Sequence, residues 1–400
     1  MSREYDNGDA EMEIGDEEEE PENLDEFPPD EMVSINDDST HLLNEHKKDV
    51  FSLTFSSEHN LLVSGAEDDS AIVWEFGGAR SFGDLQKTAI KQHEDSVIEV
   101  NFNHDDSLFA TADMSGRIFI HETKSRSTLF EINECNDLEW TVWHPSCNIL
   151  FAGASDGSVF MFLLGKTQVE RSKVFLTNTS AACTIGNLLP DGKNLLCGYD
   201  DGRVCMWELK DGSHRDVSLQ SPCRSMDVHS KLSVAAVGID NGQTALINTS
   251  NMSVIVKLTN NTSDKNKEDE FSVETVKFAP EQFPWLAVGT ANGLLTIFDF
   301  ESGKPRHECT HDEMAVVKCQ WLLVGSDNLR IITACIDGGL RGWDAKSGEP
   351  VFFKSGGGHE IFDFSIAHLF NQLVILTACA EGAIRVFPYV EESQQDSEIQ

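Results

Sequence analysis

Basic residues and long apolar runs are both scarce in this sequence. Its 400 residues include 30 lysines and arginines against 68 aspartates and glutamates, which gives a formal net charge of −38. A nucleic-acid partner is disfavoured, because phosphate binding needs basic surface. No apolar run approaches the roughly 18 residues that a membrane span needs, and the acidic N-terminus is the opposite of a signal or transit peptide. We therefore expect a soluble, cytoplasmic protein without a membrane span.

Motifs for metal binding and catalysis are also missing. Ten cysteines are scattered without a Cys-x-x-Cys pair or other metal-ligand spacing, so we expect buried, reduced thiols. We find no Walker loop, no His-Glu-x-x-His and no dinucleotide-binding fingerprint. We expect no metal and no cofactor, and a protein that is not an enzyme.

The main feature of the sequence is a motif that is repeated from residue 46 to residue 388. Its copies end at eight positions that lie 40–51 residues apart, namely Trp74, His121, Phe162, Trp207, Ile247, Phe298, Trp343 and Phe387. A period of about 40–45 residues with four strands per repeat is typical of WD-type propeller blades. We predict an all-β WD-repeat β-propeller with eight blades. Seven blades remain the alternative, because the copies ending at His121, Ile247 and Phe387 depart from a generic blade.

Turn and strand patterns place the repeats along the chain. They fall at residues 46–76, 93–122, 135–163, 178–209, 221–248, 270–299, 311–344 and 359–388. Segments 77–92 and 259–270 predict longer surface loops. The last repeat supplies only three strands, and a ring has no free sheet edge only if its ends are joined. We therefore predict that Thr40–Asn44 forms the outer fourth strand of the last blade.

The propeller domain is predicted over residues 39–390, with an acidic tail at each end. Residues 1–38 carry a charge of −16 and residues 391–400 carry −4, which leaves −18 on the propeller. Residues 1–38 cannot bury enough apolar area to offset the entropy of ordering, so we expect a disordered acidic N-terminal tail. This tail is either a solubilising segment or a bait for a basic partner, and composition does not choose between them.

Two copies of the repeat contain a full set of buried polar residues. In each set we expect the Asp to accept from the His, the His to bond the hydroxyl, and the hydroxyl to accept the indole N–H of the Trp. The sets are His46, Ser64, Asp68 and Trp74, and His311, Thr333, Asp337 and Trp343.

A Ser/His/Asp set also suggests nucleophilic catalysis. The hydroxyl lies mid-strand, however, without the strained Gly-x-Ser-x-Gly elbow of such enzymes. The set also fades in other blades, with Ser115 at the Asp position of blade two and Ala152 at the hydroxyl position of blade three. We therefore interpret both sets as structural, because a spread structural feature can erode and one catalytic site could not.

Three stretches and the acidic N-terminal segment are similar to one family. The stretches are Asp137–Pro145, with two tryptophans beside an acid, Ala112–Gly116 and Gly198–Gly202. Over residues 39–390 the chain resembles the angio-associated migratory cell protein family. The resemblance implies two kinds of function. Relatives on the yeast side are eight-bladed chaperones of one basic large-subunit ribosomal protein, and the animal members are associated with cell migration and signalling.

The resemblance to propellers also implies a peptide-binding end, where the starts of the innermost strands and the residues before the turn Asp point outward. The set that it implies is made of acids with aromatics between them: Asp49, Phe51, Glu67, Asp137, Glu139, Asp200, Asp240, Glu274, Glu360 and Phe362. One interpretation is that these are simply solvated charges and strand ends. The other is a site in which carboxylates bond arginines and the two Phe rings lie under guanidinium planes.

The predicted function follows from the charge and the resemblance together. We expect a monomeric, non-enzymatic protein that captures a basic protein segment, with a chaperone of a large-subunit ribosomal protein in ribosome biogenesis as the leading possibility. The alternative is a signalling or cytoskeletal scaffold in cell migration and angiogenesis-type processes.

Overall fold

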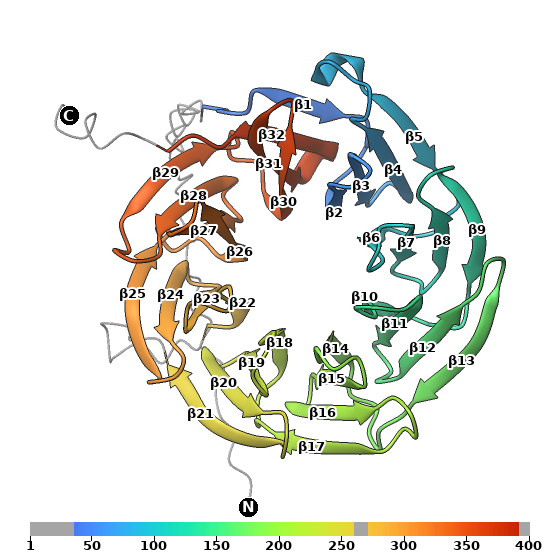
Figure 1. Ribbon diagram of the computed structural model, residues 1–400, viewed down its shortest axis with the longest axis vertical. Helices are drawn as coiled ribbons and strands as arrows, with labels where there is room; N and C mark the ends of the chain where they lie inside the picture. Colours follow the sequence, from blue (N-terminus) through green and yellow to red (C-terminus); the bar gives the residue numbers. More distant parts are fainter. Residues whose placement is uncertain (1–35, 260–270, 392–400) are drawn as a thin grey trace, which may run out of the picture. The chain divides into compact units, whose positions relative to one another are not determined.

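Eight similar sheets form the described part of the chain. The structure is a computed structural model that describes residues 36–259 and 271–391. Within these ranges, 32 strands form eight four-stranded antiparallel sheets, arranged as the blades of a ring (Figure 1). The prediction of an eight-bladed all-β propeller is confirmed, and the seven-bladed alternative is wrong.

The blades are numbered here from the first complete sheet, and their strands run outward from the centre of the ring. Blade 1 contains β2 (Val50–Ser56), β3 (Leu61–Ala66), β4 (Ser70–Glu75) and β5 (Gln86–Ile90). Blade 2 contains β6 (Val97–Phe102), β7 (Leu108–Asp113), β8 (Ile118–Glu122) and β9 (Ser127–Ile132). Blade 3 contains β10 (Leu138–Trp143), β11 (Ile149–Ala154), β12 (Val159–Leu164) and β13 (Val169–Phe175). Blade 4 contains β14 (Cys183–Leu188), β15 (Asn194–Tyr199), β16 (Arg203–Glu208) and β17 (His214–Ser218).

The second half of the ring repeats the same order. Blade 5 contains β18 (Cys223–Val228), β19 (Val234–Ile239), β20 (Gln243–Asn248) and β21 (Ser253–Thr259). Blade 6 contains β22 (Val273–Phe278), β23 (Trp285–Thr290), β24 (Leu294–Asp299) and β25 (Lys304–Thr310). Blade 7 contains β26 (Val316–Val324), β27 (Asn328–Cys335), β28 (Gly339–Asp344) and β29 (Pro350–Ser355). Blade 8 contains β30 (Ile361–Leu369), β31 (Gln372–Cys379), β32 (Ala383–Pro388) and β1 (His41–Asn44). Two short 3-10 helices, η1 (Phe82–Asp84) and η2 (Ala380–Gly382), lie in connections.

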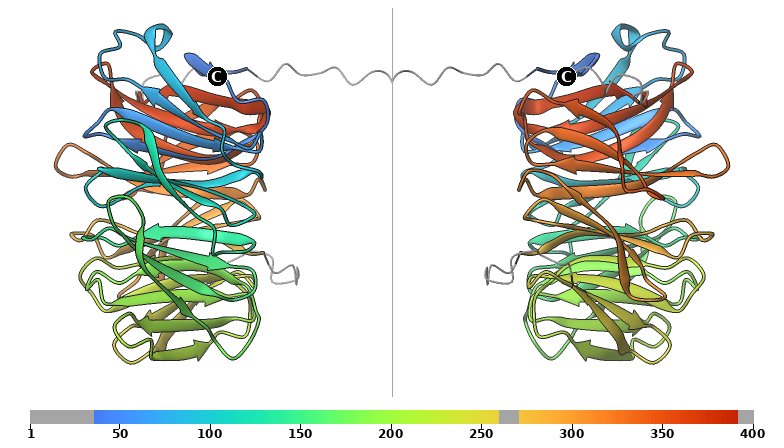
Figure 2. Two further views of the ribbon diagram at one scale, coloured as in Figure 1. Left: turned by 90° about the vertical axis from the view of Figure 1, so that its right-hand side faces the viewer. Right: turned by 90° about the vertical axis from the view of Figure 1, so that its left-hand side faces the viewer.

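The core lies between neighbouring blades rather than inside one. One buried cluster, for example, joins Leu53 and Trp74 of blade 1 to Leu376 and Ile384 of blade 8. The second and third strands are almost wholly buried, whereas an outer strand such as β21 alternates between exposed and half-buried residues and has one buried residue, Leu258. Each blade therefore buries its faces only against its neighbours, as in other repeat architectures. In side view, the strands run from one face of the ring to the other, and the turns lie at these two faces (Figure 2).

The N-terminal segment of the described chain closes the ring. Strand β1 pairs antiparallel with β32, with His41 opposite Val386 and Asn44 opposite Ala383. This confirms the prediction that Thr40–Asn44 supplies the fourth strand of the last blade. Just before it, the Asp38 N–H donates to the Ser355 carbonyl of blade 7 at 2.8 Å. The guanidinium of Arg385 in blade 8 donates to Asp37 at 3.1 Å. The first described residues thus tie blades 7 and 8 together.

Some sequence-based boundaries need correction or stay untested. The loop predicted at 77–92 contains η1 and the outer strand β5, whose residues are mostly exposed and polar and so show little hydrophobic periodicity. Most of the predicted loop 259–270 lies outside the described residues, as do both predicted tails apart from residues 36–38 and Glu391. The domain boundaries at 39 and 390 therefore remain predictions.

The state of the cysteines and the question of a membrane-spanning helix can be described for residues 36–259 and 271–391. All ten cysteines are free thiols, and nine of them are buried, with Cys147 as the exposed exception. Within the described ranges there is no helix whose length and apolar character would suffice to cross a membrane.

Candidate peptide-binding face

One backbone hydrogen bond repeats in all eight blades and marks one face of the ring. In each blade the residue directly after the second strand donates its N–H to the carbonyl of the residue directly before the innermost strand, at 2.8–3.1 Å. The donors are Glu67, Met114, Ser155, Asp200, Asp240, Ala291, Ile336 and Ala380. The acceptors are Asp49, Ser96, Asp137, Ala182, Pro222, Ser272, Ala315 and Glu360. The repeated bond brings two distant parts of each repeat to the same place.

Each innermost strand also carries a bulge at its second residue. The pairing with the next strand skips that residue in all eight blades. The residue before it is buried, whereas the bulged residue is exposed or half-buried. Bulges often re-aim a side chain beside a functional site. We call these eight residues the bulge ring: Phe51, Ile98, Glu139, Thr184, Arg224, Glu274, Val317 and Phe362.

The structure brings all ten sequence-predicted partner-binding residues to this face. Asp49, Asp137 and Glu360 stand directly before innermost strands, and Glu67, Asp200 and Asp240 directly follow second strands. The other four, Phe51, Glu139, Glu274 and Phe362, belong to the bulge ring. We call the donors, the acceptors and the bulge ring together the binding face. Whether these residues contact a partner stays a prediction.

Arg224 is the one residue of the binding face that carries positive charge, and sequence reasoning missed it. Its guanidinium lies 3.1 Å from an oxygen of Asp240 and 3.5 Å from an oxygen of Asp200. A sequence signal for it exists. In blades 1 to 5 the bulged residue precedes the donor by sixteen positions, so counting back from Asp240 reaches Arg224. Two of the eight predicted acids are therefore already paired with Arg224.

The remaining acids of the binding face are less neutralised. Glu67 pairs with Lys48 at 3.3 Å, and Asp49 accepts the N–H of Glu381 at 2.8 Å. Within residues 36–259 and 271–391, Asp137, Glu139, Glu274 and Glu360 form no ion pair. These four carboxylates are the ones free to accept a cation from a partner.

Glu139 stands in an unfavourable electrostatic environment. Partial burial raises its pKa, and the negative charges of Asp200 and Asp137 add to the rise, while Arg224 opposes it. A cation placed beside Glu139 would relieve this repulsion, because an opposite charge favours the ionised form. The geometry therefore provides a reason for a basic group to bind between blades 3 and 4.

The polar chain predicted in blade 1 is formed by its four residues. The His46 Nδ1–H lies 3.1 Å from Asp68, and His46 Nε2 lies 2.8 Å from the Ser64 hydroxyl. The Trp74 Nε1–H donates to the same hydroxyl at 3.0 Å. Burial lowers the pKa of His46 more than Asp68 raises it, so the imidazole stays neutral. This is a satisfied buried network, and its hydroxyl is engaged on both sides.

The chain predicted in blade 7 is only partly formed. His311 Nε2 lies 2.8 Å from the Thr333 hydroxyl, which also accepts the Trp343 Nε1–H at 3.3 Å. The expected bond from His311 to Asp337 is wrong, because His311 Nδ1–H instead donates to the Gly293 carbonyl at 3.0 Å. Asp337 is held by Arg341 at 3.1 Å and by the Gly339 N–H at 2.8 Å. The arginine four residues on takes the carboxylate that the histidine was expected to use.

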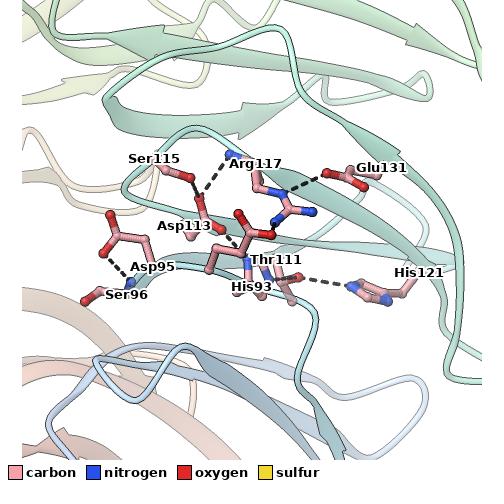
Figure 3. A network of polar contacts seen from close by, with 10 residues as sticks. His93, Asp95, Ser96, Thr111, Asp113, Ser115, Arg117, His121 and Glu131 are labelled. Atoms are coloured by element: carbon pink, nitrogen blue, oxygen red, sulfur yellow. Dashed lines mark hydrogen bonds and ion pairs between the residues drawn. The ribbon is translucent and has the colours of Figure 1, made fainter.

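Blade 2 contains a third chain that sequence reasoning missed (Figure 3). His93 bridges Asp113 at 2.9 Å and the Thr111 hydroxyl at 2.8 Å, and His121 Nε2 lies 3.0 Å from the same hydroxyl. The acid stands two residues after the hydroxyl instead of four, and His121 replaces the Trp. Ser115, at the expected Asp position, donates to Asp113 at 2.6 Å. Burial, with His93 nearby, lowers the pKa of His121 to about 3, so it is neutral.

The unusual tryptophan stretch supports the face from below. Trp140 directly follows the bulged Glu139, and its Nε1–H donates to the Cys183 carbonyl of blade 4 at 2.9 Å. A Cβ added at Gly153 or Gly186 would lie 2.2 Å or 2.1 Å from the indole, so only glycines leave room for it. Trp140 thus locks blades 3 and 4 together beneath the acidic part of the face.

A cavity lies on the other side of the ring from the binding face. It has a volume of about 310 Å³, lies where β6 and β10 end, and is lined by residues that include Phe102, Trp143 and His144. In the described ranges no group of three or more His, Cys, Asp or Glu residues is placed to hold a metal ion.

Known proteins resemble this chain over most of its length. The model of the WD domain, G-beta repeat family matches residues 37–75, 83–122 and 174–208. The human angio-associated migratory cell protein is 31% identical over 364 residues, covering 88% of this chain and 80% of its own length. The ribosome assembly protein SQT1 of Saccharomyces cerevisiae is 23% identical over 390 residues, covering 89% of this chain and 88% of its own length.

A solved complex shares the fold. The crystal structure of Chaetomium thermophilum Sqt1 bound to the N-terminus of the ribosomal protein L10 matches with a TM-score of 0.75 at 21% identity. The match covers 88% of this chain and all of that one. At this identity the match shows the shared eight-bladed architecture.

Proposed function

This chain belongs to the angio-associated migratory cell protein family, and from that premise we propose that it is a binding protein and not an enzyme. It captures a basic segment of another protein on the binding face. The client we propose is the N-terminal segment of a large-subunit ribosomal protein of the L10 kind, which the chain escorts in the cytoplasm until ribosome assembly. The related Sqt1 in complex with that segment supports this choice.

The observation that carries the proposal is the gathering of eight acids around one face with a single arginine among them. Carboxylates make charge-assisted, often bidentate bonds to arginine. A contact that becomes desolvated contributes about 1–3 kcal/mol, whereas a pair that stays at the rim contributes at most about 1 kcal/mol. We propose that Glu139 and Glu274 make the strongest contacts, because both stand in the bulge ring and neither has a cation of its own.

Long-range attraction adds to this. The predicted charge of −18 on residues 39–390 has the same sign as the two acidic tails. A basic client is therefore attracted by all three, which raises its association rate and makes that rate fall with salt.

A charge-reversal experiment tests the proposal. The Glu139→Lys/Glu274→Lys variant is compared with Glu58→Lys/Glu301→Lys, whose two acids lie in turns at the other ends of the strands and are exposed. Binding of a fluorescent peptide with the N-terminal sequence of L10 is measured by anisotropy at 50 and 300 mM salt. We expect tight, salt-sensitive binding by the wild type and the control, and at least tenfold weaker binding by the binding-face variant. Equal affinities for the two variants, or binding indifferent to salt, would overturn the proposal.

The second candidate is a signalling or cytoskeletal scaffold in cell migration and angiogenesis-type processes. The name of the relatives that are 30–31% identical favours it. Depletion in cells separates the two functions. The escort function predicts loss of large ribosomal subunits in a polysome profile before motility changes, and the scaffold predicts the reverse order.

A further inference from the structure

The bulge ring is divided into two chemically different halves. In the four consecutive blades 7, 8, 1 and 2 its residues are all apolar: Val317, Phe362, Phe51 and Ile98. In blades 3 to 6 its residues are all polar or charged: Glu139, Thr184, Arg224 and Glu274. The apolar residues are consecutive around the ring because the chain closes between blades 8 and 1.

All four residues of the apolar half are half-buried, and two of them touch across a blade boundary. Phe51 and Phe362 touch edge to face, with ring centres 5.5 Å apart, although they stand in different blades. Both rings are only half-buried. Met114 and Met314 flank this half in blades 2 and 7 and are 48% and 42% exposed. Apolar side chains that gather on one face and stay partly in water often mark an interaction site.

Three acids of the binding face are close to the apolar half of the bulge ring. Asp49, Glu67 and Glu360 lie beside the apolar half, in blades 1 and 8. Asp49 is already bonded to the Glu381 N–H and Glu67 is paired with Lys48. The carboxylates of the bulge ring itself, Glu139 and Glu274, stand at the two ends of the polar half. Among the described residues, Glu360 is the one acid beside the apolar half without such a partner. Within the bulge ring itself, a segment that lies across the ring meets carboxylates on one side and apolar side chains on the other.

We propose that the client segment is bipartite, with arginines or lysines that bind the polar half and at least one large apolar side chain that binds the apolar half. This inference rests on the proposed function and adds a second chemistry to it. Charge alone attracts any polybasic segment, and the apolar half distinguishes the true client from these decoys. Removing one buried aromatic contact is expected to weaken binding by about tenfold or more.

A selection from random peptides tests this without assuming a sequence or a register. A phage library that displays random twelve-residue peptides is panned at 150 mM salt on the wild type, on Phe51→Ser/Phe362→Ser and on Glu139→Gln/Glu274→Gln. We expect wild-type peptides to be enriched both in Arg and Lys and in Phe, Tyr, Leu, Ile or Met. The first variant should select peptides that keep the basic residues and lose the apolar ones, and the second should do the opposite.

The outcomes separate this inference from the proposed function. Wild-type peptides enriched in basic residues alone would overturn the bipartite client and leave the proposed function standing. Peptides with no basic enrichment would overturn both. Thermal unfolding of each variant is measured in parallel. If Phe51→Ser/Phe362→Ser fails to fold, Met114→Ser takes its place, because a residue that is 48% exposed can be changed without opening the core. Its failure to lower the affinity of a selected peptide would also count against the inference.

Discussion

Replacing Arg224 by glutamine is expected to strengthen the binding of a basic client. Arg224 stands in the bulge ring and bridges Asp240 and Asp200 across two blades. We expect Arg224 to occupy, in the free protein, the place that an arginine of the client would take. Arg224→Gln removes one positive charge from the binding face and frees two carboxylates there.

The structure sets the size of the effect. Both ion pairs are partly exposed, with side-chain exposures of 37–50%, so each contributes at most about 1 kcal/mol to folding. For binding, a client cation about 7 Å from Arg224 is repelled by roughly 0.6–2.4 kcal/mol at effective dielectric constants of 80 to 20. Salt screening favours the lower end of this range. The variant should therefore bind a basic peptide about 3- to 50-fold more tightly.

The assay is peptide anisotropy at 150 mM salt with a matched control. Arg215→Gln makes the same change of charge on the exposed outer strand β17 and should leave the affinity unchanged. Chemical unfolding of both variants shows whether the fold is intact. Weaker or unchanged binding by folded Arg224→Gln would refute the reasoning and would mean that Arg224 itself contacts the client.

Three other changes test the architecture. Gly186→Ala should lower the free energy of unfolding by about 1–3 kcal/mol, because the new Cβ would lie 2.1 Å from the Trp140 ring; an unchanged midpoint in a urea titration would show that the indole has room to move. Burial raises the pKa of Glu99 from 4.5 to about 8 in the folded protein, and the negative charge of Asp363 adds to the rise. As the pH rises, Glu99 therefore ionises in the unfolded chain before it ionises in the folded protein, and the free energy of unfolding falls between about pH 4.5 and pH 8. Glu99→Gln should therefore stabilise the protein more at pH 8 than at pH 5 in thermal unfolding scans, and equal gains at both would contradict this. Deleting residues 36–44 leaves the edge of β32 unpaired and should produce aggregates in size-exclusion chromatography, whereas a monomeric product would mean that the ring closes without β1.

Much of the fold could be predicted because the repeat is a property of the sequence itself. The spacing of the Trp-like positions reveals eight blades even where the Trp is replaced by His121 or Ile247. The missing strand of the last repeat predicts the pairing of β1 with β32, since a closed ring leaves no edge free. Outer strands such as β5 were missed because their exposed residues do not alternate in hydrophobicity.

The site was predicted less completely, for local reasons. In blade 2 the acid that bonds His93 is Asp113, which follows the Thr111 hydroxyl by two residues instead of four. A search for an acid four residues after the hydroxyl finds Ser115 and misses Asp113. In blade 7 Arg341 donates to Asp337, so this carboxylate does not bond His311. The spacing of the repeat residues gives no sign of this arginine contact. Arg224 was missed because the start of blade 5 lacks the aligned residues that mark other blades.

The pairing of β1 with β32 has a consequence for synthesis on the ribosome. Thr40 bonds the carbonyl of Val386, a partner 346 residues later. At about 5–20 residues per second, that partner is made roughly 17–70 seconds after Thr40. Throughout this interval β1 has no β32 to pair with, and the circle can close only after Val386 has been made.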